Sequence, residues 1–284
     1  MSAPTVDDAA AADGAQPDER DAGVLLLVWT ILRMNFLLMV RYRVNFVAQI
    51  VGMYLFFAVI FFGGQAAVEN VGEGGIGSLG STLDALIVGW FLWTMAQSAY
   101  FSLSGEVTQE SRWGTLEQLY MSPYGFGTIM LTKVFVNMLL SLVMGGIMLA
   151  LILLTTGRTL SLDVITVLPI AVLALLSVVG IGFVFAGLTL IYKKLGSVSQ
   201  LMQFVILGLV AAPAAEFSVL NLLPITQGSA MLQEAMRNGV RLWEFSAVEL
   251  AVLVGTAVVY FSIGYVVFQL CSHVARKRGV MGHY

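Results

Sequence analysis

Long apolar runs constrain this chain more than any other feature of its sequence. Six runs of about 20 or more residues are each long enough, as an α-helix, to cross a hydrocarbon layer about 30 Å thick. Backbone groups in lipid must be hydrogen-bonded within the protein, so helices are the expected spanning elements. The alternating polarity of transmembrane barrel strands is not found. The sequence therefore predicts an all-α integral membrane protein.

Composition agrees with this fold class, because only 11% of residues are charged, against about a quarter in soluble proteins. We expect residues 1–22 to be a disordered acidic tail and residues 23–284 to be one transmembrane domain. Residues 23–43 are expected to form an amphipathic interfacial helix, because placing Arg33 at mid-membrane costs a few kcal/mol. The alternative, that residues 24–40 span the membrane, stays open. The six predicted spans are about 44–64, 83–104, 126–155, 164–191, 197–220 and 247–271.

The distribution of Lys and Arg predicts the orientation, since positive residues stay on the cytoplasmic side. One side of the six spans collects Arg20, Arg33, Arg41, Arg43, Arg112, Lys133, Lys193, Lys194, Arg276, Lys277 and Arg278; the other has Arg158, Arg237 and Arg241. Both termini and the loop between the second and third spans are therefore expected in the cytoplasm. The predicted location is the plasma membrane.

Catalytic and metal sites are not expected in this chain. Cys271 is the single cysteine, and the two histidines, His273 and His283, lie near the C-terminus without a cluster of further ligands.

A polar insert, residues 106–123, separates the second and third spans. Within it, Thr115 and Gln118 fit a capping box, which predicts a short helix starting there. Pro123 prevents that helix from continuing, and Gly114 allows a sharp turn before it. From these residues alone, the insert is equally well explained as a capped interfacial helix that only joins two spans.

The insert also carries a pattern of residues that resembles the ABC-2 type transporter permeases: Glu106, Glu110, Arg112, Gly114, Thr115, Leu116, Glu117, Leu119 and Pro123. The resemblance extends to an amphipathic helix before the first span, to six spans, and to a helical segment at 222–239 before the last span. It implies that the short helix is a cytoplasmic coupling helix seated on a separate nucleotide-binding subunit.

The lysines support the need for a separate ATPase. None of Lys133, Lys193, Lys194 and Lys277 is followed by Ser or Thr, so the phosphate-binding loop motif is missing. We therefore expect no enzymatic activity and no bound cofactor in this chain, with ATP and magnesium used by the partner. The hypothesis is that Glu106, Glu110, Arg112 and Glu117 contact that partner while Leu116, Leu119 and Tyr120 anchor the helix.

A substrate pathway near the second and fifth spans, at a dimer interface, is implied by the same resemblance. The candidate residues are Trp90, Trp93, Gln97, Gln200, Gln203 and Phe204. Glu216 is a candidate on a different ground, because Pro213 before it can bend the fifth span and turn Glu216 towards an interior cavity. Separately, Gly180, Gly182, Ala186 and Gly187 predict close helix contact in the fourth span, either within one protomer or between two.

The function expected is a permease subunit of an ABC exporter that works as a homodimer or heterodimer with two ATPase subunits. The lipid bilayer is its setting, and no nucleic-acid partner is expected. Two alternatives stay open: an ion-coupled secondary transporter, which needs no ATPase, and a non-transporting membrane scaffold subunit.

Overall fold

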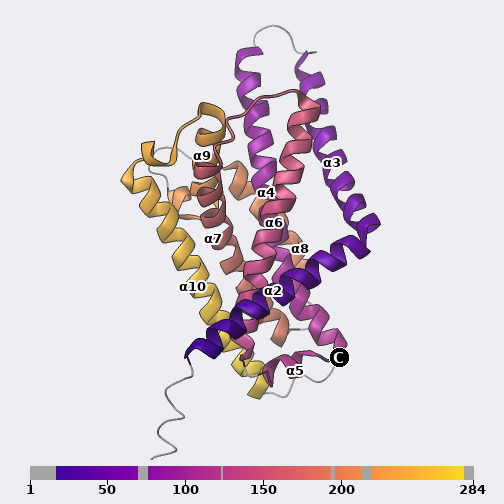
Figure 1. Ribbon diagram of the computed structural model, residues 1–284. Helices are drawn as coiled ribbons and strands as arrows, with labels where there is room; N and C mark the ends of the chain where they lie inside the picture. The colour runs from indigo at the N-terminus through magenta and orange to yellow at the C-terminus, as the bar shows by residue number, and fades with distance from the viewer. Residues whose placement is uncertain (1–16, 70–75, 123, 193–195, 213–218, 278–284) are drawn as a thin grey trace, which may run out of the picture. The chain divides into compact units, whose positions relative to one another are not determined.

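A computed structural model describes residues 17–69, 76–122, 124–192, 196–212 and 219–277 (Figure 1). Contacts divide the chain into two units, Met1–Val47 and Ala48–Tyr284. The first unit contains α2 (Pro17–Arg41) and the beginning of α3 (Arg43–Glu69). On α2, Thr30, Arg33 and Arg41 line one shallow hollow of the helix surface, so they share a face as the helical period requires.

Five helices among the described residues are long and apolar enough to cross a membrane. They are α3, α4 (Ile76–Trp113), α6 (Phe126–Thr156), α7 (Val164–Ile191) and α10 (Ala247–Lys277). The regular elements in the described ranges are helices only. The predicted all-α membrane protein is thus confirmed, and the chain is a multi-pass membrane protein.

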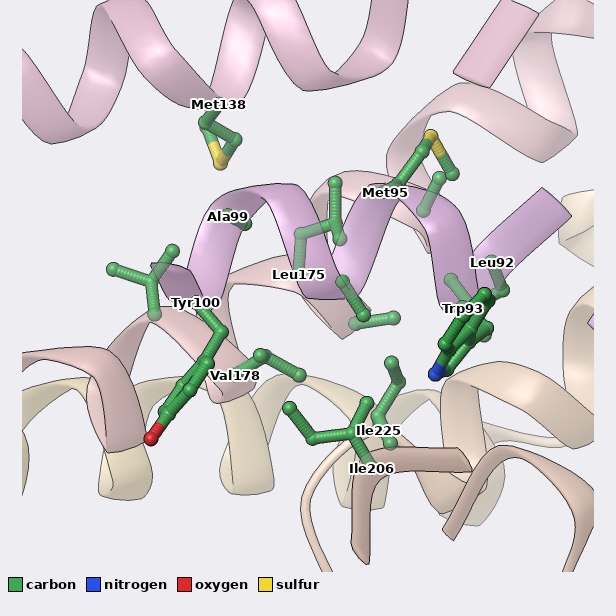
Figure 2. Close-up of a cluster of buried hydrophobic side chains, with 14 of the residues drawn as sticks. Leu92, Trp93, Met95, Ala99, Tyr100, Met138, Leu175, Val178, Ile206 and Ile225 are labelled. Atoms are coloured by element: carbon green, nitrogen blue, oxygen red, sulfur yellow. The ribbon is translucent and has the colours of Figure 1, made fainter. Parts of the chain in front are cut away.

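Helix α4 lies at the centre of the hydrophobic core of the second unit. In its apolar window 67% of the residues are buried, against 11% in α3. Figure 2 shows Leu92, Trp93 and Tyr100 of α4 among side chains from neighbouring helices, including Leu175 of α7 and Ile206 of α8 (Gly196–Ala211). The partners of α4 therefore come from segments far apart in the sequence.

Glycines let α7 and α10 approach until their backbones touch. A Cβ atom on Gly180 would lie 2.2 Å from the Tyr260 carbonyl oxygen, and one on Gly264 would lie 2.0 Å from the Gly180 oxygen. Gly187 meets Phe268 in the same way, while Gly182 faces the backbone of α4 at Tyr100. The predicted close contact in the fourth span is confirmed, and these contacts lie within one chain.

The contacts between α7 and α10 also fix their direction. Gly180 faces Tyr260 and Gly187 faces Phe268, so residue numbers rise together and the two helices run parallel. The chain between Ile191 and Ala247 must therefore return to the opposite end of the bundle. Helix α8 belongs to this return, followed by η1 (Val219–Leu222), α9 (Thr226–Asn238) and η2 (Leu242–Glu244).

Helix α9 packs into the second unit through small and polar side chains. Thr226, Gln227 and Ser229 are buried, and the Ser229 hydroxyl donates a hydrogen bond of 2.7 Å to the Val210 carbonyl oxygen of α8. The Ile225 amide, just before α9, donates to the Ser177 hydroxyl of α7 at 2.9 Å. The Ile225 amide and the Ser229 hydroxyl are thus satisfied by neighbouring helices.

Several helix bounds differ from those expected from hydropathy. In the region of the expected fifth span, 197–220, helix α8 ends at Ala211, shortly before Pro213, a residue that disrupts helical hydrogen bonding. Helix α4 extends beyond 83–104 to Ile76 and Trp113, and α10 continues to Lys277. These ends are more polar than the middle of each helix, so hydropathy marks only the apolar part. The fourth span was predicted at 164–191, and α7 has these bounds.

Candidate functional site

Residues 106–113, the first part of the polar insert, are helical and belong to α4, which ends at Trp113. Glu106 and Glu110 therefore lie one helical turn apart on the same face of α4. On α6, Lys133 and Asn137 have the same spacing. Since α4 and α6 run antiparallel and pack together, the two pairs of side chains meet.

Lys133 forms ion pairs with both glutamates. Its Nζ atom lies 2.7 Å from Glu110 Oε1 and 3.2 Å from Glu106 Oε2. The Lys133, Glu106 and Glu110 side chains are only 11%, 24% and 16% exposed. The Asn137 amide donates a short hydrogen bond to Glu106 Oε1. Each carboxylate thus points into the bundle and is held by α6.

Gly114 and Thr115 turn the chain from α4 into α5 (Leu116–Tyr120). Gly114 has a φ of 69°, which glycine adopts without the strain of a side chain. The Thr115 hydroxyl donates to the Glu110 carboxylate, and its amide donates to the Glu110 carbonyl oxygen at 3.1 Å. The short helix begins where the capping box predicted it, but the threonine side chain binds Glu110 of α4.

Aromatic side chains connect α5 with the interior of the bundle. The Tyr120 ring stacks on Phe126 of α6, with centroids 4.0 Å apart and an interplanar angle of 13°. Phe126 stacks on Phe268 of α10 at 5.6 Å, and Phe268 lies 5.4 Å from Phe183 of α7. Burial raises the pKa of the Tyr120 phenol above its usual 10.0. Leu116 is buried and Leu119 packs against the core, so α5 is anchored on its apolar side.

The remaining surface around α5 is open. Trp113 is 67% exposed and Met121 is 78% exposed, and they flank α5 on either side. Nothing is described for the side chains of Arg112 and Glu117, and Pro123 lies outside the described residues. Of the coupling residues predicted from the insert, Glu106, Glu110, Gly114, Thr115, Leu116, Leu119 and Tyr120 are brought together at the junction of α4, α5 and α6.

Sequence reasoning missed Lys133 and Asn137 as members of this cluster. Lys133 lies near the end of a predicted span, where a lysine can extend its amine to the membrane surface, so its position gave no sign of a partner. The matching i, i+4 spacing of Glu106 with Glu110 and of Lys133 with Asn137 was the available signal.

A second polar contact joins α4 with α8 inside the apolar region. The Gln97 side-chain amide donates to Gln203 Oε1 at 2.9 Å, and Trp93 Nε1 donates to the Gln203 carbonyl oxygen at 3.4 Å. Trp90 packs on Trp93, with ring centroids 4.8 Å apart. Four of the predicted pathway residues therefore lie together.

The other predicted pathway residues are not part of this contact. Phe204 is 64% exposed and Gln200 is also exposed. Glu216 lies outside the described residues. The part of the chain that the structure describes contains no group of three or more His, Cys, Asp or Glu side chains that could hold a metal ion.

Comparison with known proteins assigns the chain to a family. The family model of ABC-2 family transporter proteins matches residues 75–266, which include all of helices α4 to α9. No curated protein matches the chain. The match covers more than half of the sequence and includes both polar contacts of α4. The chain belongs to the ABC-2 family of transporter proteins and is a membrane permease subunit of an ABC transporter.

Proposed function

We propose that this chain is the permease subunit of an ABC exporter, driven by a separate ATPase subunit that docks on α5. The observation that carries this proposal is the anchoring of α5, a helix of five residues, to three membrane helices. It is tied to α4 through Thr115 and Glu110, and to α6 and α10 through the Tyr120, Phe126 and Phe268 rings. A force applied to α5 would therefore reach several spans at once.

In this proposal, the surface on which the ATPase docks is mainly apolar. Glu106 and Glu110 are directed to Lys133, and Glu110 also positions the start of α5 through the Thr115 hydroxyl. Trp113 and Met121 are large, exposed and adjacent to α5, and residues of this kind are enriched at protein interfaces. Arg112 and Glu117 remain candidates for charged contacts with the ATPase.

Six membrane crossings complete the proposed topology. The five long helices are joined by α8, whose 16 residues span about 24 Å. That length is short for a hydrocarbon layer of about 30 Å, and α9 packs at the end of α8. With both termini in the cytoplasm, α5 lies on the cytoplasmic side, where Tyr120 is close to Arg276 in the last turn of α10.

The rest of the proposal follows from the resemblance and the charge distribution. The permease works as a dimer with a second permease protomer in the plasma membrane, and ATP and magnesium are used by the ATPase. Residues 1–22 form an acidic tail, residues 23–43 lie on the membrane surface, and residues 23–284 form one transmembrane domain. Export is favoured because the loops on the outer side are too short to receive a binding protein.

Docking is tested by co-purifying the chain with candidate ABC ATPase subunits from the same genome. Trp113→Ser should reduce the amount of ATPase retained, because it removes the largest exposed apolar side chain near α5. Trp243→Ser is the matched control, since Trp243 is 64% exposed and lies just before α10, at the opposite end of the bundle. Equal retention by both variants, with normal membrane insertion, would reject α5 as the docking site.

A further inference from the structure

The second unit contains a cleft between α3, α4 and α6. Its volume is about 290 Å³, close to the lower end of small-molecule sites. Its wall on α3 includes Gln49, Ile50 and Met53, and its wall on α4 includes Gln97 and Ser98. Methionines of α6 complete the lining. The cleft lies on the face of α4 that points away from the bundle of α7 and α10.

Loose packing of α3 explains why the cleft exists. Farther along α3, Phe57 and Phe61 are buried, and the Phe57 ring lies 5.6 Å from Trp90 of α4. Gln49 comes two helical turns before Phe57 and is exposed. Helix α3 is thus fixed to α4 near Phe57, while the preceding two turns border the cleft.

The depth of the cleft places polar groups inside the apolar layer. Gln97 lies close to the middle of the apolar stretch Thr82–Ser111 of α4. Polar side chains at this depth are costly unless they have partners, so they mark binding or transport sites in membrane proteins. The described residues that line the cleft include amide, hydroxyl, thioether and aromatic side chains, and no ionisable group.

These properties define the chemistry of an occupant. Hydroxyl or amide groups of a ligand would find partners at Gln49, Gln97 and Ser98, and an alkyl chain would contact the methionines. A charged head group would be buried without a counter-ion, which is strongly unfavourable in a low-dielectric site.

We infer that the cleft binds an uncharged amphiphile with a hydroxyl- or amide-bearing head, which enters from the bilayer beside α3. The inference rests on the proposed transport function and names the substrate class for it. Gln97 connects the cleft with α8, because its side-chain amide donates to Gln203 Oε1 at 2.9 Å. An occupant hydrogen-bonded to Gln97 would therefore contact the residue that joins α4 to α8.

Photolabelling of the full chain in phosphatidylcholine nanodiscs tests the inference. The probe is a monoacylglycerol with a diazirine in its acyl chain, and the comparison probe is the fatty acid with the same chain, which is charged. We expect the monoacylglycerol to label peptides from α4 and α6 that line the cleft, and unlabelled monoacylglycerol to compete. The fatty acid should label them more weakly.

Two substitutions on α3 supply matched variants. Ile50→Phe should fill the cleft and reduce labelling about tenfold, which corresponds to about 1.4 kcal/mol of binding. Val51→Phe adds the same ring one residue along the helix, outside the lining, and should leave labelling unchanged. Helical circular dichroism and elution volume verify that both variants are folded.

The inference is overturned if labelling is not competed, if Ile50→Phe labels like the unsubstituted chain, or if the two probes label equally, since each outcome indicates ordinary contact with bulk lipid. Because no ATPase is present in this experiment, such a failure leaves the docking result at Trp113 intact. If instead labelling is competed but Trp113→Ser and Trp243→Ser retain equal amounts of ATPase, the binding site stands and α5 is rejected as the docking site.

Discussion

Lys133 Nζ lies 2.7 Å from Glu110 Oε1 and so joins the third membrane helix to the end of the second. The same carboxylate receives the Thr115 hydroxyl, so α5 is positioned through a residue that itself depends on Lys133. Glu110 is therefore an internal link between α4, α5 and α6.

Lys133→Met should destabilise the protein, because it leaves two largely buried carboxylates without their cation. Removing one partner of a buried ion pair costs about 3–5 kcal/mol, and the partial exposure of Glu106 brings our expectation to the lower end of that range. The measurement is the Tm of the purified protein in detergent. Adding Glu106→Gln and Glu110→Gln to Lys133→Met should recover part of the loss. A Tm unaffected by Lys133→Met would show that the pairs do not stabilise this end of the bundle.

Gly264→Ala should separate α7 and α10, because its Cβ would lie 2.0 Å from the Gly180 carbonyl oxygen. Overpacking of this kind costs about 1–3 kcal/mol, and a backbone contact cannot relax by moving a side chain. The comparison is Gly255→Ala on the same helix, where nothing lies within 4 Å of the added Cβ. Equal Tm values for the two variants would contradict the close contact.

Gln97→Leu and Gln203→Leu should weaken the same contact between α4 and α8. Interhelical hydrogen bonds in membranes contribute about 0.6 kcal/mol on average, so the double variant should be less destabilised than the sum of the single ones. Thermal unfolding of all three variants gives the coupling energy. Transport assays on the single variants should show reduced transport; additive stability effects with normal transport would remove both residues from the proposed pathway.

Tyr120→Phe should change how stability depends on pH at the alkaline end. Burial raises the pKa of Tyr120 in the folded protein above 10.0, so the folded state holds the proton more tightly than the unfolded state. The contribution of the Tyr120 phenol to the stability of the folded state is fully present below pH 10 and is lost as the pH rises through the folded pKa. Above about pH 10, the Tm of the unsubstituted chain should therefore fall relative to the Tm of Tyr120→Phe. A constant difference between pH 8 and pH 11 would indicate that the phenol is not buried.

Local patterns identified much of the fold correctly. The bounds of α7 were predictable because Asp163 and Tyr192 limit a continuous apolar run, and Asp163 accepts a hydrogen bond from the Ile165 amide at the helix start. The short helix α5 was predictable from Thr115 and from the proline that follows it. The end of α8 at Ala211 was missed because the span was predicted from hydropathy, which stays high beyond Ala211; Pro213 was the available signal.

What the sequence alone determined is local: apolar length specifies spanning helices, Gly114 permits the turn before α5, and the glycines of α7 permit a close neighbour. What only the tertiary structure decided is which surfaces meet. Glu110 and Lys133 are 23 residues apart, and Gly180 and Gly264 lie on different helices, so no local pattern specifies either partner. The antiparallel packing of α4 and α6 places Lys133 against Glu106 and Glu110, so both carboxylates are paired within the chain. The pairing matters because a largely buried carboxylate without a cation is strongly destabilising.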